Sequence, residues 1–139
     1  LMIVLPQPFD DDGDGLLTGG AAPFCAAMLR AMGIAEHEVY FASALPAPMA
    51  MPEWDRLAAA GLGEVLRHHI ALAAPQRVLL CGRAQLALFG IAPEQAREPL
   101  SVDCNGSPHA LLAAPDLRNL ARSAVRRENF WNRWLDWTR

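Results

Sequence analysis

Short apolar runs that alternate with segments of helical spacing constrain the fold of this chain more than any other feature. Residues 2–5, 39–45 and 77–82 form three such runs, and each is closed by proline or glycine. Largely apolar runs of this length are typical of strands buried on both faces of a sheet. Because helical segments separate them, the strands are expected to run parallel. The 139 residues therefore predict one domain, 1–139, with a three-layer α/β/α architecture around a mostly parallel sheet of four or five strands.

Three helices are expected between these strands and directly after them. Residues 21–33, 53–74 and 83–90 have apolar positions at helical spacing, and each segment ends at a glycine or before a proline. Gly61 and Gly63 are expected to weaken the middle of the second helix.

The last part of the chain carries a turn signal and one further helix. Asn105 and Gly106 stand between two apolar stretches, which indicates either a β-hairpin or a strand followed by a turn and a loop. Asp116 is positioned to cap the final helix. The apolar face predicted for this helix consists of Leu117, Leu120, Ala121, Ala124, Val125, Trp131, Trp134 and Leu135.

The net charge of −3 restricts how the chain could bind a nucleic acid. Phosphate neutralisation dominates such binding, so it would have to rely on a local patch of arginines. Arg126 and Arg127, next to the aromatic residues of the final helix, are the candidate contacts. The aromatic residues themselves are better explained as the buried stripe of an amphipathic helix.

Cysteine spacing and hydropathy indicate the compartment. Cys25, Cys81 and Cys104 are widely separated and lack C-x-x-C spacing, so they predict neither a disulfide framework nor a metal site, and no cofactor is expected. No apolar run approaches the roughly 20 residues of a membrane span. A cytoplasmic protein is the simplest expectation, and the use of Arg without Lys is typical of a GC-rich bacterial genome.

The acidic stretch "PFDDDGDGLLTGG" resembles the first half of a calcium-binding EF-hand loop. Asp10, Asp12 and Asp14 would be the first ligands, with Gly15 at the turn. The twelfth position, which should supply a bidentate carboxylate, is Ala21. We therefore expect a solvated acidic loop rather than a calcium site.

Among the histidines, His109 is a better candidate for a functional residue than His68 and His69. His68 and His69 are adjacent on a helix and point about 100 degrees apart, so they are not expected to bind one metal. His109 follows the Asn-Gly turn at the expected end of a strand, where open α/β sheets bind their ligands. The chain contains no complete phosphate loop, nucleophile elbow or Rossmann glycine pattern.

Taken in order, five stretches resemble the uracil-DNA glycosylase superfamily, most closely its compact iron–sulfur (family 4) type. The resemblance covers nearly the whole chain and implies that superfamily's fold and a connection with DNA repair. Such enzymes flip a base out of the stack, hold it in a pocket and stabilise an oxocarbenium-like sugar while water attacks. The stretches are "MIVLPQPFDDDGDGLLTGGAAPFCAAMLRAMGI", "VYFASALPAP", "EVLRHHIALAAPQRVLLCGRAQLALFG", "SPHALLAAP" and "FWNRWLDW".

The residues that carry the chemistry in this family are replaced here. The resemblance places Pro6 where the water-positioning acid stands, with Gln7 as the nearest polar group. Leu17 takes the place of the aromatic residue that stacks on the base. Ser43 takes the place of the asparagine that reads the base, and it offers fewer hydrogen bonds than an amide.

The late loop and the cluster ligands also depart from the family. Ser107 stands at the position of the histidine that stabilises the departing anion, and His109 lies two residues later, on the same face if the segment is extended. Ala47 and, roughly, Leu62 occupy two of the cysteine positions, so no iron–sulfur cluster is expected.

We therefore expect a degenerate uracil-DNA glycosylase-like protein without standard uracil excision, which binds DNA or a nucleobase. One alternative is an active N-glycosidase of altered base preference, with Asp11 or Asp12 positioning water and His109 as the donor. Another is a non-catalytic protein that binds a protein partner. The residual pocket is expected to be lined by Gln7, Asp11, Asp12, Leu17, Ser43, Ser107 and His109.

Overall fold

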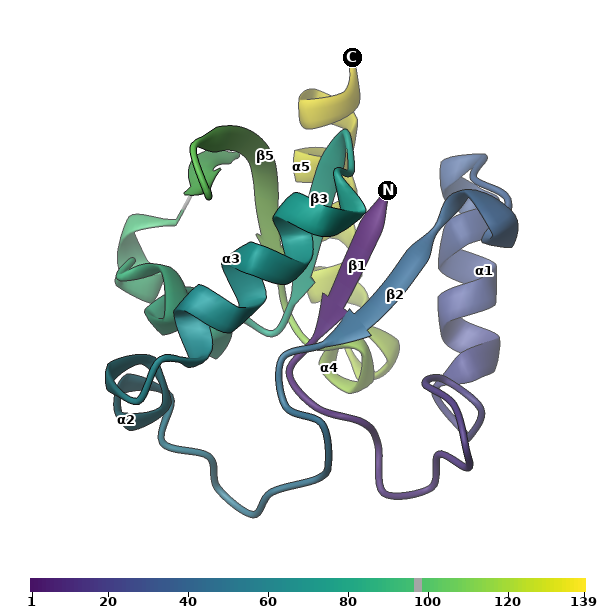
Figure 1. Cartoon of the computed structure of the whole chain (residues 1–139). Coiled ribbons are helices and arrows are strands. Elements are labelled where there is room, and N and C mark those ends of the chain that lie inside the picture. Colours follow the sequence, from purple (N-terminus) through teal and green to yellow (C-terminus); the bar gives the residue numbers. More distant parts are fainter. Residues whose placement is uncertain (97–98) are drawn as a thin grey trace.

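The computed structural model describes residues 1–96 and 99–139 and contains one five-stranded sheet in the order β2-β1-β3-β5-β4 (Figure 1). Neighbouring strands are parallel except for β4 and β5, which are antiparallel. The predicted three-layer α/β/α fold is confirmed, with five strands. The strands are β1 (Met2–Leu5), β2 (Tyr40–Ser43), β3 (Arg77–Cys81), β4 (Leu100–Cys104) and β5 (Ser107–Ala114). The α-helices are α1 (Ala22–Met32), α2 (Trp54–Ala59), α3 (Leu62–Ala73), α4 (Leu117–Arg122) and α5 (Ala124–Thr138), and the 3₁₀ helices are η1 (Glu36–Glu38), η2 (Arg83–Phe89) and η3 (Pro93–Gln95).

The central strands are buried on both faces, as their continuous apolar runs predict. In β1, Met2 and Val4 belong to the apolar cluster that α2, α3 and η2 cover, whereas Ile3 and Leu5 belong to the cluster that α1, α4 and α5 cover. The alternation follows from the two-residue period of a strand. Helices therefore lie on both sides of the sheet, with α3 on one face and α5 on the other (Figure 1).

Two segments predicted as single helices are each divided in two. The segment 53–74 breaks into α2 and α3 at Gly61, whose φ of 102° lies in the left-handed region that favours glycine. The final helix breaks at Ser123, whose extended backbone separates α4 from α5 and whose hydroxyl accepts a hydrogen bond from the N–H of Arg126. Ser123 thus caps a new helix in the middle of the predicted one.

The break at Ser123 changes which side chains of the last segment are buried. Leu117, Leu120 and Trp134 are buried as predicted, but Val125 and Leu135 are 66% and 38% exposed. Phe130, which the predicted apolar face omits, is buried. The predicted face assumes one continuous helix, whereas the extended backbone of Ser123 ends α4 and the helical periodicity starts anew in α5.

The Asn-Gly signal is a β-hairpin, so the first of the two interpretations is confirmed. Asn105 and Gly106 have φ values of 54° and 86°, and they join Cys104 to Ser107 in the antiparallel β4–β5 pair. Two residues of positive φ form the tight turn that suits the twist of paired strands. β5 begins at this turn and ends at Ala114. Because it runs parallel to β3, Ala114 lies at the same edge of the sheet as Cys81, the last residue of β3.

The cysteines are free and buried, and burial raises the pKa of the Cys81 thiol. Burial also raises the pKa of Cys25, to about 11, so this thiol stays protonated and unreactive near neutral pH. Within the described ranges, none of the helices has the length and apolar character needed to cross a membrane.

Candidate ligand-binding site at the carboxyl edge of the sheet

The strand order places a switch point between β1 and β3. The chain passes from β1 to β2 on one side and then crosses over to β3 on the other side of β1. Loops that follow such a pair of strands leave in opposite directions, and this opens a crevice where α/β proteins bind ligands. A cavity of about 500 Å³ lies at this position. Its polar and aromatic lining consists of Gln7, Trp54, Arg83, Gln85, Asp116, Asn119 and Arg126.

Glycine at position 82 lets the loop after β3 approach the loop after β1. Gly82 has a φ of 116°, and a Cβ atom on it would lie 3.3 Å from Cγ of Pro6 and 3.4 Å from Nε2 of Gln85. The N–H of Gly82 also donates to the carbonyl of Ala114, which aligns the ends of β3 and β5. The floor of the cavity is therefore built from the carboxyl ends of three neighbouring strands.

Gln85 is the buried polar side chain of this cavity. Its residue is fully buried, and its Nε2 donates to the carbonyl oxygens of Cys81 at 2.9 Å and Val4 at 3.4 Å. Two carbonyl acceptors around one end of the amide assign that end as the NH₂ group. Its Oε1 is also buried and has no hydrogen-bond partner among the described residues. Leaving a buried acceptor unpaired costs about 1–3 kcal/mol.

Asp116 lines the cavity, but its carboxylate is engaged in capping α4. One oxygen accepts from the N–H of Asn119 at 3.0 Å, and the other accepts from the side-chain amide of Asn119 at 2.5 Å. The predicted role of Asp116 as a helix cap is confirmed. A carboxylate held by two donors stabilises the helix end and is poorly placed to activate water.

Two arginines bring positive charge to the cavity. The Nη2 atom of Arg83 donates to the carbonyls of Pro93 at 2.6 Å and Ala96 at 3.0 Å, which fixes the side chain at the wall. Arg126 comes from the first turn of α5 and is exposed at the rim. Arg126, the predicted nucleic-acid contact, therefore lines the same cavity as Gln7, a residue of the predicted pocket.

Arg127 has a different role from Arg126. Its Nη1 atom donates to the carbonyls of Leu120 at 2.9 Å and Ala121 at 2.8 Å, which are among the last carbonyls of α4. Such groups lack partners inside the helix, so Arg127 closes the end of α4.

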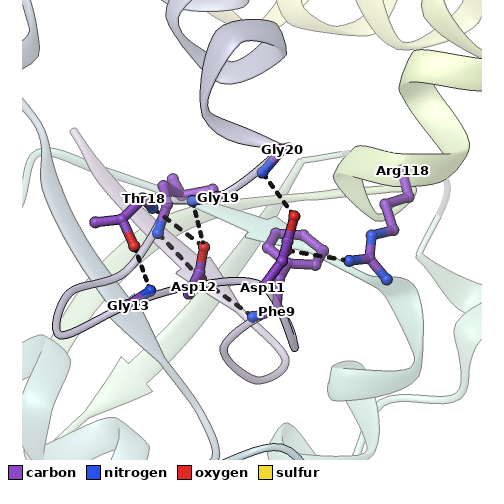
Figure 2. A network of polar contacts seen from close by, with 9 residues as sticks. Phe9, Asp11, Asp12, Gly13, Thr18, Gly19, Gly20 and Arg118 are labelled. Carbon is purple, nitrogen blue, oxygen red and sulfur yellow. Dashed lines mark hydrogen bonds and ion pairs between the residues drawn. The ribbon is translucent and has the colours of Figure 1, made fainter.

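The acidic loop is organised around Asp12, as Figure 2 shows. The carboxylate of Asp12 accepts backbone N–H groups from Phe9, Leu17, Thr18 and Gly19 at 3.0–3.2 Å. Partial burial raises the pKa of this carboxyl, but the hydrogen bonds from Gly19, Phe9, Leu17 and Thr18 outweigh it and hold the pKa below its ordinary value. The charge of Asp12 thus holds the loop closed rather than facing a ligand.

Asp11 packs beside this closed loop. Its carboxylate accepts from the N–H of Gly20 at 2.7 Å and lies 3.5 Å from the guanidinium of Arg118 (Figure 2). The same guanidinium lies over the ring of Phe9, 4.6 Å from its centre. Asp11 therefore ties the start of α1 to α4. Across residues 1–96 and 99–139, no three His, Cys, Asp or Glu side chains gather as ligands for a metal ion.

The other residues predicted for the pocket near the first two strands, Ser43, Leu17 and Gln7, lie in three different environments. Ser43 lies with Asp12 beside a hollow of about 450 Å³, and its hydroxyl donates to the carbonyl of Leu45 at 2.7 Å. Leu17, whose φ is 56°, packs against the apolar cluster under α1. Gln7 lines the cavity, and its Oε1 accepts from the N–H of Met49 at 2.9 Å.

Ser107 and His109 do not join this site, so the predicted convergence of one pocket is wrong. Both lie at the amino end of β5, whereas Gln7 and Ser43 lie at the carboxyl ends of β1 and β2. At about 3.3 Å per residue, His109 is roughly 16 Å along the strand from Ala114. The prediction failed because β5 begins at the hairpin instead of ending there.

The histidines at the amino end of the sheet make separate contacts. His109 Nδ1 lies 3.2 Å from the carbonyl oxygen of Pro75. His69 Nε2 lies 2.8 Å from the hydroxyl of Tyr40, and His68 Nδ1 lies 3.0 Å from the amide of Asn105. The two adjacent histidines thus contact different partners.

Sequence reasoning missed several residues of the cavity. Trp54, Arg83, Gln85 and Asn119 were not proposed as site residues, and Asp116 was considered only as a cap. A usable signal was present, since Arg83 and Gln85 directly follow a buried strand and the switch point lies where β1 meets β3.

The fold and this cavity define an α/β protein with a cavity at the switch point of its sheet. A comparison with models of protein families found no match, and a search of curated proteins found no relative either.

Proposed function

We propose that this chain is a uracil-DNA glycosylase-like protein that binds a nucleobase, as a nucleotide or within a nucleic acid strand, without performing standard uracil excision. The observation that carries the proposal is the position of the 500 Å³ cavity at the β1/β3 switch point. Ligand sites of α/β proteins occur at this position, and their volumes are about 300–1,000 Å³.

The lining of the cavity suits a planar polar ligand attached to a phosphate. Trp54 supplies an aromatic surface, and Gln7 supplies an amide group. Arg126 at the rim supplies a cation of the kind that binds phosphate. A base in the cavity with its phosphate at the rim would use all three kinds of group.

The hydrogen bonds already made by the carboxylates near the cavity support the absence of standard uracil excision. Asp116 is held by Asn119, and Asp12 is held by four backbone N–H groups. A general base needs a free acceptor within reach of its water. The alternative enzyme, in which Asp12 and His109 act on one base, is disfavoured because His109 lies at the opposite end of the sheet.

The experiment that tests nucleic-acid binding is a fluorescence anisotropy titration with a labelled single-stranded oligonucleotide. We expect binding that weakens steeply as salt rises, because phosphate contacts release counterions. Arg126→Ala should weaken binding and reduce the salt slope, whereas Arg30→Ala, an exposed arginine of α1, serves as the matched control. The absence of binding at low salt, for the oligonucleotide and for free nucleotides, would favour the protein-partner alternative instead.

A second assay tests the catalytic part of the proposal. The protein is incubated with single- and double-stranded oligonucleotides that contain one deoxyuridine, and abasic sites are revealed by alkaline cleavage. We expect no release above a protein-free control. Release at the rates of a working glycosylase would overturn this part of the proposal and leave base binding intact.

A further inference from the structure

A groove between α1 and α5 lies apart from the cavity at the switch point. It encloses about 260 Å³, and no described residue lines both the groove and that cavity. Met28 and Phe130 form part of its floor and are buried. Apart from Arg127, the described side chains that line this α1/α5 groove are apolar, among them Phe24, Ala27, Ala31 and Trp131.

Arg127 is the charged side chain of the groove within the described ranges. Its Nη1 atom donates to the carbonyls of Leu120 and Ala121, and these bonds hold the side chain in place. Its Nε and Nη2 atoms have no hydrogen-bond partner within residues 1–96 and 99–139. Nε and Nη2 form one edge of the guanidinium, and such an edge binds both oxygens of a carboxylate. A carboxylate can therefore bind Arg127 without displacing the bonds that fix it.

The cation lies at one end of the groove. The carboxylate of Asp11 joins the start of α1 to α4, so α4 and the Arg127 bonded to it lie beside the first turns of α1. Phe24 is in these first turns, and Ala31 follows it by about 10 Å along the helix axis. The groove thus has a charged end near Phe24 and an apolar remainder that extends towards Ala31.

We propose that the α1/α5 groove binds a medium-chain fatty carboxylate, with its anionic group on Arg127 and its alkyl chain between the two helices. Charge complementarity selects the anionic group, and burial of the chain against apolar walls provides the driving force. A volume of about 260 Å³ is smaller than the roughly 300–1,000 Å³ of drug-sized sites, which favours one short chain over a phospholipid or a peptide helix. The inference does not depend on the proposed function, because the two sites share no described residue.

The first test compares octanoate with octan-1-ol, which have chains of equal length and differ in charge. Without a cation the alcohol should bind at least as well, because removing a carboxylate from water is costly. With Arg127 at the groove, isothermal titration calorimetry at low salt should show octanoate binding about threefold or more tightly than the alcohol. The preference should shrink as salt rises. Equal or tighter binding of octan-1-ol, or no binding of octanoate, would overturn the proposal.

Ala27→Leu tests whether the ligand occupies this groove. Ala27 is exposed at the groove wall, so the larger side chain should fill the space without disturbing the buried floor and should weaken octanoate binding about tenfold or more. Ala59→Leu, at an exposed position of α2, is the matched control and should bind octanoate normally. Unchanged affinity in Ala27→Leu would place the ligand elsewhere and overturn the proposal. Ala31→Leu, also exposed at the wall, provides the same test if Ala27→Leu does not fold.

Arg127→Met tests the role of the cation, because it keeps a long apolar side chain and removes the charge. The preference for octanoate over octan-1-ol should disappear in this variant. It should remain in Arg30→Met, which removes an exposed arginine of α1 that does not line the groove. A preference that persists in folded Arg127→Met would overturn the assignment.

Two further outcomes decide the remaining cases. If thermal unfolding shows that Arg127→Met does not fold, the salt dependence measured on the unaltered chain decides, and a preference that salt leaves unchanged counts against an ion pair. A peptide with a carboxyl-terminal leucine that binds the unaltered chain but not Ala27→Leu, where octanoate binds neither, would assign the groove to a protein partner and overturn the proposal.

Discussion

A Cβ atom on Gly63 would lie 2.2 Å from the carbonyl oxygen of Leu88, so α3 and η2 touch through their backbones. Gly63→Ala should therefore destabilise the protein, although alanine is the better helix former by about 1 kcal/mol. Forcing an atom into a packed contact costs about 1–3 kcal/mol, and backbone on the other side leaves little room to relax. Urea unfolding should show a net loss of about 1–2 kcal/mol.

Gly15→Ala is the matched control for this substitution. Its Cβ would lie 3.6 Å from Cγ2 of Thr18, an ordinary contact, and the residue is exposed. We expect a change within about 0.5 kcal/mol. If Gly63→Ala were as mild as Gly15→Ala, the close approach of α3 to η2 would be incorrect.

Asp12 is predicted to stabilise the fold rather than to act on a ligand. Asp12→Ala removes the acceptor of four backbone N–H groups and should lower the free energy of unfolding by about 2–3 kcal/mol. Asp12→Asn should be only partly tolerated, because its NH₂ group would face two N–H donors. Asp14→Ala, at an exposed position of the same loop, should be nearly neutral in urea unfolding. A neutral Asp12→Ala would contradict the closed loop.

The same carboxylate predicts a dependence of stability on pH. The pKa of Asp12 is lowered from 3.8 in the folded state, so its contribution is fully present above about pH 4. It is lost as the pH falls through the folded pKa. The difference in unfolding free energy between the unaltered chain and Asp12→Asn should therefore shrink as the pH is lowered from about 5 to values below 3.8. A difference that stays constant over this range would mean that Asp12 does not titrate with folding.

Much of the fold could be predicted from the sequence because local signals and tertiary packing agree in the central strands. Residues 2–5 and 77–81 are continuously apolar, and they are buried on both faces of the sheet. The two helix breaks were harder to predict. Gly61 and Ser123 are each compatible with a continuous helix, and the turn they actually form depends on packing elsewhere.

The site was less predictable because it depends on the direction of β5. The stretch that contains Ser107 and His109 is largely apolar and has turn residues on both sides. Its sequence alone does not show which of its ends lies at the carboxyl edge of the parallel sheet. The hairpin with β4 and the parallel pairing with β3 decide that Ala114 lies there. A prediction that treated Asn105–Gly106 as a tight hairpin would have moved the candidate residues to the segment after Ala114.

Arg126 and Arg127 are neighbours in sequence, but the structure predicts different effects for their substitution. Arg127→Ala removes two charge-assisted hydrogen bonds to the carbonyls of Leu120 and Ala121 and should cost about 1–2 kcal/mol in urea unfolding. Arg126→Ala should change stability by less than about 0.5 kcal/mol, since the residue is exposed at the cavity rim. Equal losses in both variants would contradict the assignment of Arg127 to the end of α4.

Trp54 should report on occupancy of the cavity. It is half-buried and lines the cavity from the start of α2, so a base bound there would change the polarity around its indole ring. Titration with uridine 5′-monophosphate should change the tryptophan emission, and Trp54→Phe should abolish most of that change. Trp131→Phe is the control, because Trp131 lies beside a separate apolar groove between α1 and α5. An emission change that disappears in Trp131→Phe and persists in Trp54→Phe would place the ligand in that groove instead.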